Sequence, residues 1–156
     1  MRVLLPLDCR TALCEALASA GSREIGGILM GEHVSDNFFC VRALTIQKHS
    51  GAFASFVRLL EDVLRPLAAF FRVTGHNYRR YNYLGEWHSH PSFALKPSQP
   101  DIQTMRDIVD DPAVGANFVV LLIVKLDSTG ALRGAPFVFP VGRAHYLATL
   151  EIEHEH

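Results

Sequence analysis

The stretch of this chain that most restricts its fold covers residues 86–105, where two histidines, a serine and an aspartate stand at fixed spacing. His88 and His90 are separated by one residue. Because side chains alternate across a β-strand, both would lie on one face and could share a metal ion. The aromatic-rich residues 81–85 favour a strand before them, and Pro91 removes the backbone donor that would continue it. The sequence therefore predicts a histidine pair at a strand end.

A helix start follows this pair. Ser98 is a typical N-cap, Pro100 suits the first helical turn, and Asp101 stands three residues after the cap, in the capping-box position. This spacing places Ser98 and Asp101 on one face, beside the positive end of the helix dipole, which keeps a carboxylate ionised. Two histidines with one carboxylate and an open fourth position are typical of catalytic, not structural, zinc sites.

Each half of the pattern also has an ordinary structural explanation. A His-x-His pair is most often two strand histidines without a metal, and Ser-x-x-Asp is usually only a helix cap. The two halves occur together here with seven residues between them. Prolines at positions 91, 97 and 100 suit a rigid loop that returns the helix start to the strand. The combination favours a metal site.

In type and spacing these residues match the hallmark of the JAMM zinc metalloproteases, also called the JAB or MPN-plus (Mov34/PAD-1-like) family, which adds a glutamate far upstream. The chain resembles that family over about residues 24–105. The resemblance implies that His88, His90 and Asp101 bind one Zn²⁺. It further implies that Glu24 orients and deprotonates the zinc water, and that Ser98 steadies the oxyanion.

The upstream glutamate has a competitor. Glu24 opens a glycine-rich apolar segment, where an acidic residue is most often a solvated edge position, and only the resemblance selects it as the base. Glu86 lies two residues before His88 and would share its strand face, where it could act as base or as a partner behind the ligands. The resemblance favours Glu24 as the base and leaves Glu86 a supporting role.

The same resemblance gives the functional hypothesis. It implies a zinc-dependent isopeptidase or peptidase that hydrolyses bonds at the C-terminal tail of a ubiquitin-like protein, in deconjugation or precursor processing. The short spacing between elements resembles compact prokaryotic, deubiquitinase-like members, so we expect a bacterial enzyme. Its partners would be a ubiquitin-like protein or its conjugate. The family alone suggests E1- or E2-like proteins of the same pathway as further partners, and antiviral defence as the biological role.

Other functions fit less well. A catalytically silent MPN-type scaffold would typically lose ligands, and none is missing here. A zinc nucleobase deaminase needs His-x-Glu and Pro-Cys-x-x-Cys signatures, which are not found. DNA-repair-associated relatives carry a similar His-x-His-Pro motif, but a net charge of -1 counts against nucleic-acid binding.

Length and composition set the domain organisation. With 156 residues, 49% of them hydrophobic, the chain can bury one core without disulfides, and its three cysteines show no C-x-x-C spacing. We expect one JAB/MPN-type metalloprotease domain over residues 1–150 and a frayed tail over 151–156. The longest apolar run, residues 118–124, is too short to span a membrane. We therefore expect a cytoplasmic protein without membrane contact.

The pattern of elements predicts an α/β (α+β) sandwich in which helices flank both sides of a mixed, largely antiparallel sheet, and the resemblance implies the cytidine-deaminase-like form of that fold. The expected strands cover residues 3–5, 25–33, 38–47, 117–126 and 137–139. Asp8 is expected to cap a first helix that Gly21 closes. A long helix should start near Phe53, with Phe56 and Val57 in its apolar stripe, and Pro66 should kink or split it near Asp62.

Overall fold

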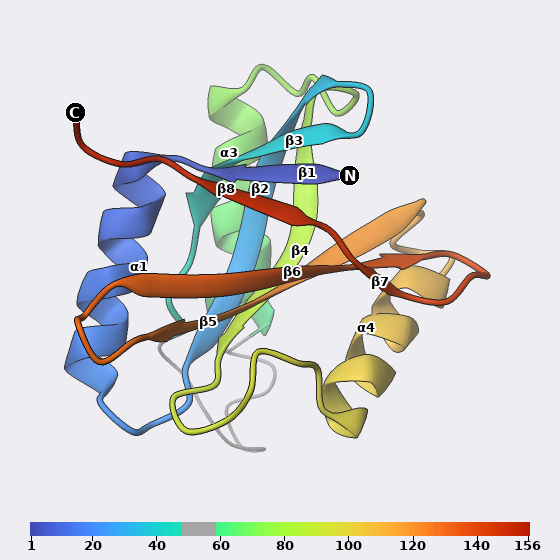
Figure 1. The fold of residues 1–156 in the computed structure, drawn as a ribbon. Helices are drawn as coiled ribbons and strands as arrows, with labels where there is room; N and C mark the ends of the chain where they lie inside the picture. Colours follow the sequence, from blue (N-terminus) through green and yellow to red (C-terminus); the bar gives the residue numbers. More distant parts are fainter. Residues whose placement is uncertain (48–58) are drawn as a thin grey trace.

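A computed structural model describes residues 1–47 and 59–156 of the chain. The elements follow the expected alternation of strands and helices (Figure 1). In chain order they are β1 (Arg2–Leu5), α1 (Leu7–Ala20), β2 (Gly26–Ser35), β3 (Phe38–Leu44), the π-helical segment η1 (Leu59–Leu64), α3 (Arg65–Val73), β4 (Tyr81–Ser89), α4 (Gln99–Asp110), β5 (Phe118–Leu126), β6 (Leu132–Pro140), β7 (Tyr146–Leu147) and β8 (Thr149–Ile152).

The strands form one mixed sheet with the order β7-β6-β5-β4-β2-β3-β1-β8. Antiparallel pairing joins β2 to β3 and β4, and β6 to β5 and β7. Parallel pairing joins β4 to β5 and β1 to β3 and β8. Because β4 and β5 are parallel, the chain must cross over between them, and α4 makes that crossover. The mixed, mainly antiparallel sheet is confirmed.

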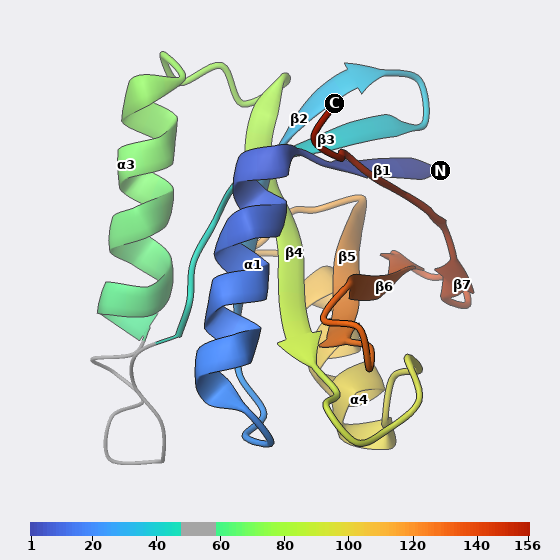
Figure 2. The same ribbon diagram turned by 60° about the vertical axis from the view of Figure 1, so that its left-hand side comes forward.

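Helices cover both faces of this sheet, as Figure 2 shows. Helix α1 lies on one face and buries Leu13 and Leu17 in a core with Val120, Leu122 and other sheet residues. Helix α4 lies on the opposite face and packs on the alternate residues of β5, such as Leu121. Helix α3 covers the β2 and β4 part of that second face. The apolar run in β5 is buried from both sides, which explains why it does not alternate with polar residues.

A bulge in β4 decides which side chains reach the α4 face. Leu84 and Trp87 both pack in the α1 core although they are three residues apart, so the alternation of β4 changes between them. The change occurs at Gly85, where φ is +151° and the register with β2 shifts. Such a bulge re-aims the side chains that follow it. As a result His88 points to the α4 face.

Two expectations about chain ends need correction. Helix α1 begins at Leu7 after Pro6, with no side-chain cap, and Asp8 lies inside the first turn, where its Oδ1 accepts from the backbone N–H of Cys9. The predicted frayed tail is wrong for its first residues, because β8 pairs with β1 up to Ile152. Glu153 is also fixed, since its backbone N–H donates to the carbonyl of Leu5. The sequence carries no local signal for this long-range pairing.

The helix that was expected to begin near Phe53 can be compared only in part. Phe53, Phe56 and Val57 lie outside the described residues. Further along, the chain is π-helical over η1 and becomes α-helical at Arg65, with Pro66 in the first turn of α3. A first turn needs no backbone donor at that position, so Pro66 is accommodated where the helix changes from π to α. The change falls after Leu64 and not at Asp62.

Within residues 1–47 and 59–156, no helix has both the length and the apolar character needed to cross a bilayer.

Candidate active site

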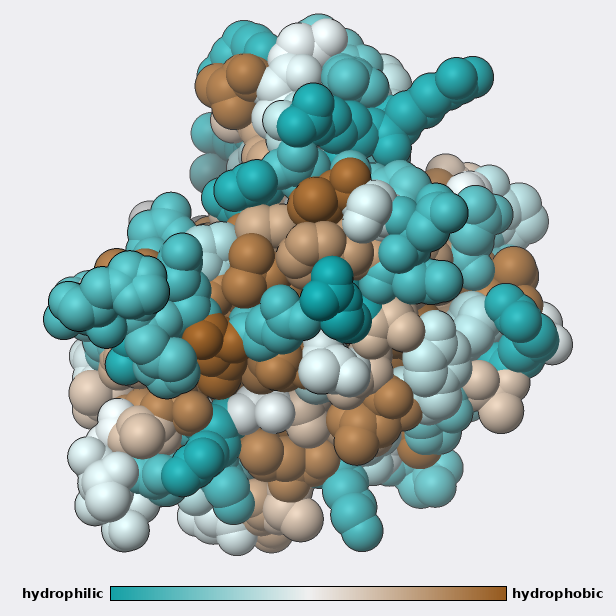
Figure 3. Space-filling view, turned by 45° about the horizontal axis from the view of Figure 1, so that its top comes forward, coloured by the Kyte–Doolittle hydropathy of each residue, from teal (hydrophilic) through white to brown (hydrophobic). Residues whose placement is uncertain are grey.

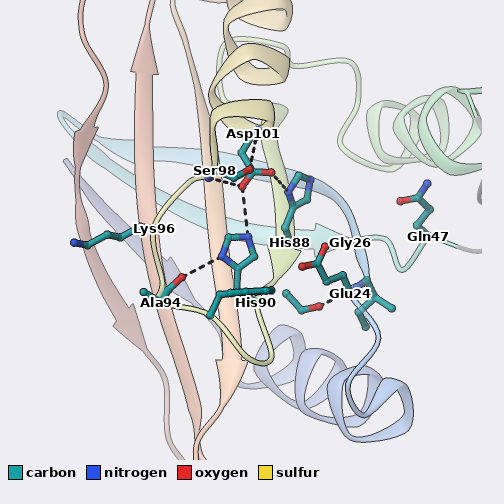
Figure 4. A pocket seen from close by; sticks show the side chains of 12 residues that line it. Glu24, Gly26, Gln47, His88, His90, Ala94, Lys96, Ser98 and Asp101 are labelled. Atoms are coloured by element: carbon teal, nitrogen blue, oxygen red, sulfur yellow. Dashed lines mark hydrogen bonds and ion pairs between the residues drawn. The ribbon is translucent and has the colours of Figure 1, made fainter.

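Three segments meet at the end of β4. This strand supplies His88 and leads directly to His90, the first turn of α4 supplies Asp101, and the segment before β2 supplies Glu24. These side chains, together with Ser98, line one cleft with a volume of about 560 Å³ (Figure 4). The structure therefore brings all five residues of the sequence motif to one place.

The two histidines lie on either side of the Asp101 carboxylate. His88 Nδ1 is 3.2 Å from Asp101 Oδ1, and His90 Nε2 is 3.4 Å from Asp101 Oδ2. Asp101 is held by the predicted capping box: the backbone N–H of Ser98 donates to its Oδ2 at 2.8 Å, and its own backbone N–H donates to Ser98 Oγ at 3.2 Å. The cap that starts α4 thus also orients the carboxylate.

The protonation of this group follows from its surroundings. Burial tends to raise the pKa of Asp101, but the hydrogen bonds from Ser98 and the neighbouring His88 outweigh it and lower that pKa. Burial tends to lower the pKa of His88, but the hydrogen bond to Glu86 and the charges of Glu86 and Asp101 raise it. Asp101 is therefore ionised at neutral pH, as a metal ligand must be.

The residue types fit a zinc ion, and each histidine has one ring nitrogen near an oxygen of Asp101. Two donors that are each about 2.0–2.1 Å from a tetrahedral zinc lie roughly 3.3–3.4 Å apart, and both histidine–aspartate separations are close to that value. Within residues 1–47 and 59–156, no group of three or more His, Cys, Asp or Glu side chains is arranged to hold a metal as it stands. Here each oxygen of Asp101 faces a different imidazole. The assignment of His88, His90 and Asp101 as ligands stays a prediction.

Glu24 reaches the cleft because of strand pairing that sequence alone does not give. Gly26 pairs with His88, so Glu24, two residues earlier on the antiparallel chain, lies at the level of His90. The intervening Ile25 is fixed to the β4 end by two hydrogen bonds: its N–H donates to Ser89 Oγ and its carbonyl accepts from Ser89 N–H. Figure 4 shows the Glu24 side chain on the histidine side of this segment.

Gly26 is needed for this arrangement. A Cβ at Gly26 would lie 2.7 Å from the carbonyl oxygen of Trp87 and 3.0 Å from Cδ2 of His88. Both are shorter than ordinary contacts, so a larger residue would push the imidazole of His88 out of place. The glycine-rich segment that the resemblance singled out therefore has a physical role beside the glutamate.

Glu86 does not line the cleft with the other five residues. Its Oε2 lies 3.3 Å from His88 Nε2, on the side of the ring opposite Asp101, and its side chain is 24% exposed. Of the two glutamates weighed as the base, Glu24 is therefore the one that lines the cleft, and the roles of both stay predictions.

The structure adds residues that the motif did not identify. The carbonyl of Ala94 lies 3.1 Å from His90 Nδ1, and Gln47, Phe93 and Lys96 also line the cleft. The proline-flanked loop was expected to be rigid, but nothing in the sequence says which of its carbonyls meets a histidine. Gln47 comes from the chain after β3, so only tertiary pairing places it here.

Comparisons with known proteins agree with the motif. The sequence profile of prokaryotic homologs of the JAB domain matches residues 6–134. The chain is 29% identical over 127 residues to a CD-NTase/cGAS isopeptidase of Enterobacter hormaechei subsp. hoffmannii (strain UCI 50), over 80% of this chain and 68% of the relative. Its fold is similar, with a TM-score of 0.65, to the solution structure of protein DSY2949 from Desulfitobacterium hafniense. That match covers 98% of this chain and 94% of the other at 16% identity, and it concerns the fold alone.

Proposed function

We propose a function from one premise, which is that this chain belongs to the family of prokaryotic homologs of the JAB domain. We infer that it is a zinc-dependent isopeptidase or peptidase that hydrolyses a bond at the C-terminal tail of a ubiquitin-like protein. The observation that carries the proposal is the meeting of Glu24, His88, His90, Ser98 and Asp101 at one cleft. The isopeptidase relative supports the reaction class.

His88, His90 and Asp101 would hold the metal. A bound zinc would supply Lewis acidity and would lower the pKa of a water molecule from about 15.7 to about 7. The backbone and side chain of Ser98 keep Asp101 oriented for this role through the capping box. Because Asp101 belongs to a regular helix and His88 to a central strand, the ligand positions are set by rigid elements.

Glu24 would move the proton. Its carboxylate would accept a proton from the attacking water as the C–O bond forms, and would pass it to the amine nitrogen as the C–N bond breaks. General acid–base catalysis of this kind contributes about 10²–10⁴-fold. The Ser98 hydroxyl accepts from the N–H of Asp101, so its own hydrogen remains available to donate to the oxygen of the reacting carbonyl.

The substrate is an expectation from the relative's name and the family. We propose that the leaving amine belongs either to a lysine side chain or to a linear peptide, and that the acyl side is the tail of a ubiquitin-like protein. The relative's name joins an isopeptidase with a CD-NTase/cGAS protein, so a conjugate of such an enzyme is one candidate. E1- and E2-like partners are part of the same hypothesis.

The first experiment combines zinc content with hydrolysis. Protein purified without added metal should contain about one zinc per chain, and a His88→Ala/His90→Ala variant should contain almost none. The loaded protein is then incubated with ubiquitin-like proteins joined through their C-termini to a fluorescent peptide, either at its lysine side chain or at its α-amino group. We expect the loaded protein to release the peptide. The Glu24→Gln variant should retain zinc but release no peptide.

Two outcomes would contradict the proposal. Absence of zinc even after reconstitution would favour a silent scaffold. Full activity in Glu24→Gln would refute Glu24 as the base and would direct attention to Glu86.

A further inference from the structure

Strand β2 carries a buried carboxylate that is held between two arginines. Glu32 is 3% exposed. Arg42 binds its Oε2 through Nε and Nη2, and Arg80 binds its Oε1 through Nε at 2.8 Å and Nη2 at 2.7 Å. One opposite charge is enough to neutralise a carboxylate, so the second arginine leaves a surplus of one positive charge here. Among the described residues, Glu32 is the carboxylate within ion-pair distance of either arginine.

Both arginines keep donors that Glu32 does not use. A guanidinium group has five N–H donors, and each arginine turns its Nε and Nη2 toward Glu32. The two hydrogens on each Nη1 meet no acceptor in the parts of the chain that the structure describes. The side chains of Arg42 and Arg80 are 47% and 58% exposed. These remaining donors are therefore available to a partner.

The surrounding backbone fixes the position of both guanidinium groups. Arg42 belongs to β3, and the carbonyl of Arg80 accepts from the N–H of His33 on β2 at 2.7 Å. The guanidinium carbon of Arg80 lies 5.3 Å from the centre of the Tyr81 ring. The N–H groups of Arg80 and Tyr81 both donate to the carbonyl of Asn77, which closes the preceding loop. Because these side chains are already ordered, a partner would lose little conformational entropy in binding them.

The surroundings of the pair are basic and lie far from the cleft. Residues 63–85 include four arginines and no Asp or Glu. The turn between β2 and β3 and the segment between α3 and β4 lie at one end of the molecule (Figure 1). Figure 3 brings that end forward and shows hydrophilic side chains (teal) projecting from it. The candidate active site is at the other end of β4, whose nine residues span about 26 Å.

We propose that Arg42 and Arg80 form a docking site for an acidic segment of a partner protein, whose Asp or Glu carboxylates bind the outer nitrogens of the two guanidinium groups. The planar fork of arginine matches the geometry of a carboxylate. Binding of nucleic acid depends on an extended positive field, and this chain has a net charge of -1, which favours a protein partner. The site goes beyond the proposed function, because it requires neither a metal ion nor hydrolysis.

Fluorescence anisotropy of a fluorescein-labelled peptide of glutamate and glycine tests this site. We expect saturable binding to the parent protein that weakens as NaCl is added, because salt screens exposed charges. Arg42→Lys/Arg80→Lys keeps both positive charges and their attraction to Glu32, but it removes the planar forks. The peptide should therefore bind to this variant roughly 3- to 10-fold more weakly.

A matched control makes the same change elsewhere. Arg65→Lys/Arg133→Lys alters two exposed arginines that are also paired with carboxylates, and it should bind the peptide like the parent. Backbone amide NMR of the ¹⁵N-labelled parent locates the peptide without any substitution. We expect shifts around Arg42 and Arg80 and none around Arg65 and Arg133. If Arg42→Lys/Arg80→Lys does not fold, as judged by circular dichroism, the NMR result decides.

Three outcomes would overturn the docking site: no saturable binding to the parent, parent-like affinity in Arg42→Lys/Arg80→Lys, or tighter binding of a single-stranded DNA that carries the same charge as the peptide. Zinc content is measured on the same samples and separates this site from the proposed function. A parent that binds the peptide but no zinc would refute the proposed function alone. A parent that binds zinc but not the peptide would refute the docking site alone.

Discussion

Replacement of Gly85 by alanine should destabilise the protein strongly and disturb the histidine pair. Gly85 has a φ of +151°, which side-chain-bearing residues rarely adopt. A Cβ there would lie 1.8 Å from the carbonyl oxygen of Val120 and 2.6 Å from its nitrogen. Val120 is the β5 residue that pairs with Gly85, so the added methyl group would collide with backbone that cannot rotate away.

Two costs add in this variant. A residue held in a glycine-only region of backbone conformation costs about 1–3 kcal/mol, and forcing extra volume into a packed interior typically costs about 1–3 kcal/mol. The sum, roughly 2–6 kcal/mol, is a large part of the 5–15 kcal/mol that usually separates folded from unfolded states. Relief of the collision would move β4 away from β5 and shift His88, so zinc affinity should fall in any Gly85→Ala protein that folds.

The free energy of unfolding is measured by urea titration of the metal-free protein, with two controls that separate the costs. Gly130 has a φ of +80° and no atom within 4 Å of an added Cβ, so Gly130→Ala carries the backbone cost alone. Gly27→Ala would place its Cβ 1.9 Å from the carbonyl oxygen of Thr45 without a left-handed φ, and so carries the steric cost alone. If Gly85→Ala proved as stable as Gly130→Ala, the close contact with β5 would be refuted.

Three further predictions concern single carboxylates and the cap of α4. Asp101→Asn should lose both zinc and hydrolysis, because a neutral amide is a poor zinc ligand; zinc content by mass spectrometry near one per chain would contradict the assignment. Burial favours a raised pKa for Glu32, but hydrogen bonds from Arg80 and Arg42 outweigh it and lower that pKa. Its stabilising contribution is therefore complete above about pH 4.5 and is lost as the pH falls through the folded-state pKa. Glu32→Gln should accordingly be less stable than the parent by about 1–3 kcal/mol at pH 7, and urea titrations should show the difference shrinking in acid; an unchanged difference at pH 3 would refute this. Ser98→Ala should cost about 1 kcal/mol of stability, because the N-cap of α4 is lost, and it should lower kcat by about 10²–10³-fold. Ser98→Thr should keep both properties, since it retains the hydroxyl. If Ser98→Ala lost stability but kept its kcat, the catalytic role of Ser98 would be refuted and only its role as a helix cap would remain.

Local patterns in the sequence were enough to predict the strand and the helix that carry the candidate metal ligands. The alternation of side chains in a strand places His88 and His90 together, and a capping box needs only residues three apart, so Ser98 and Asp101 could be predicted to share the first turn of α4. The apolar run of β5 likewise indicated a strand. In each case the interacting groups lie within a few residues of one another.

Only the tertiary structure decided how these segments meet. Pairing between the start of β2 and the end of β4 places Glu24 at the level of His90. Close contact between β4 and β5 requires a glycine at position 85, and the bulge there turns Glu86 and His88 toward α4. The last strand, β8, follows from pairing with β1 at the other end of the chain. The sequence by itself determined which side chains could serve a metal, because their types and short-range spacing are local properties. Their convergence was decided by strand pairing between distant residues, since partner and register depend on the whole sheet.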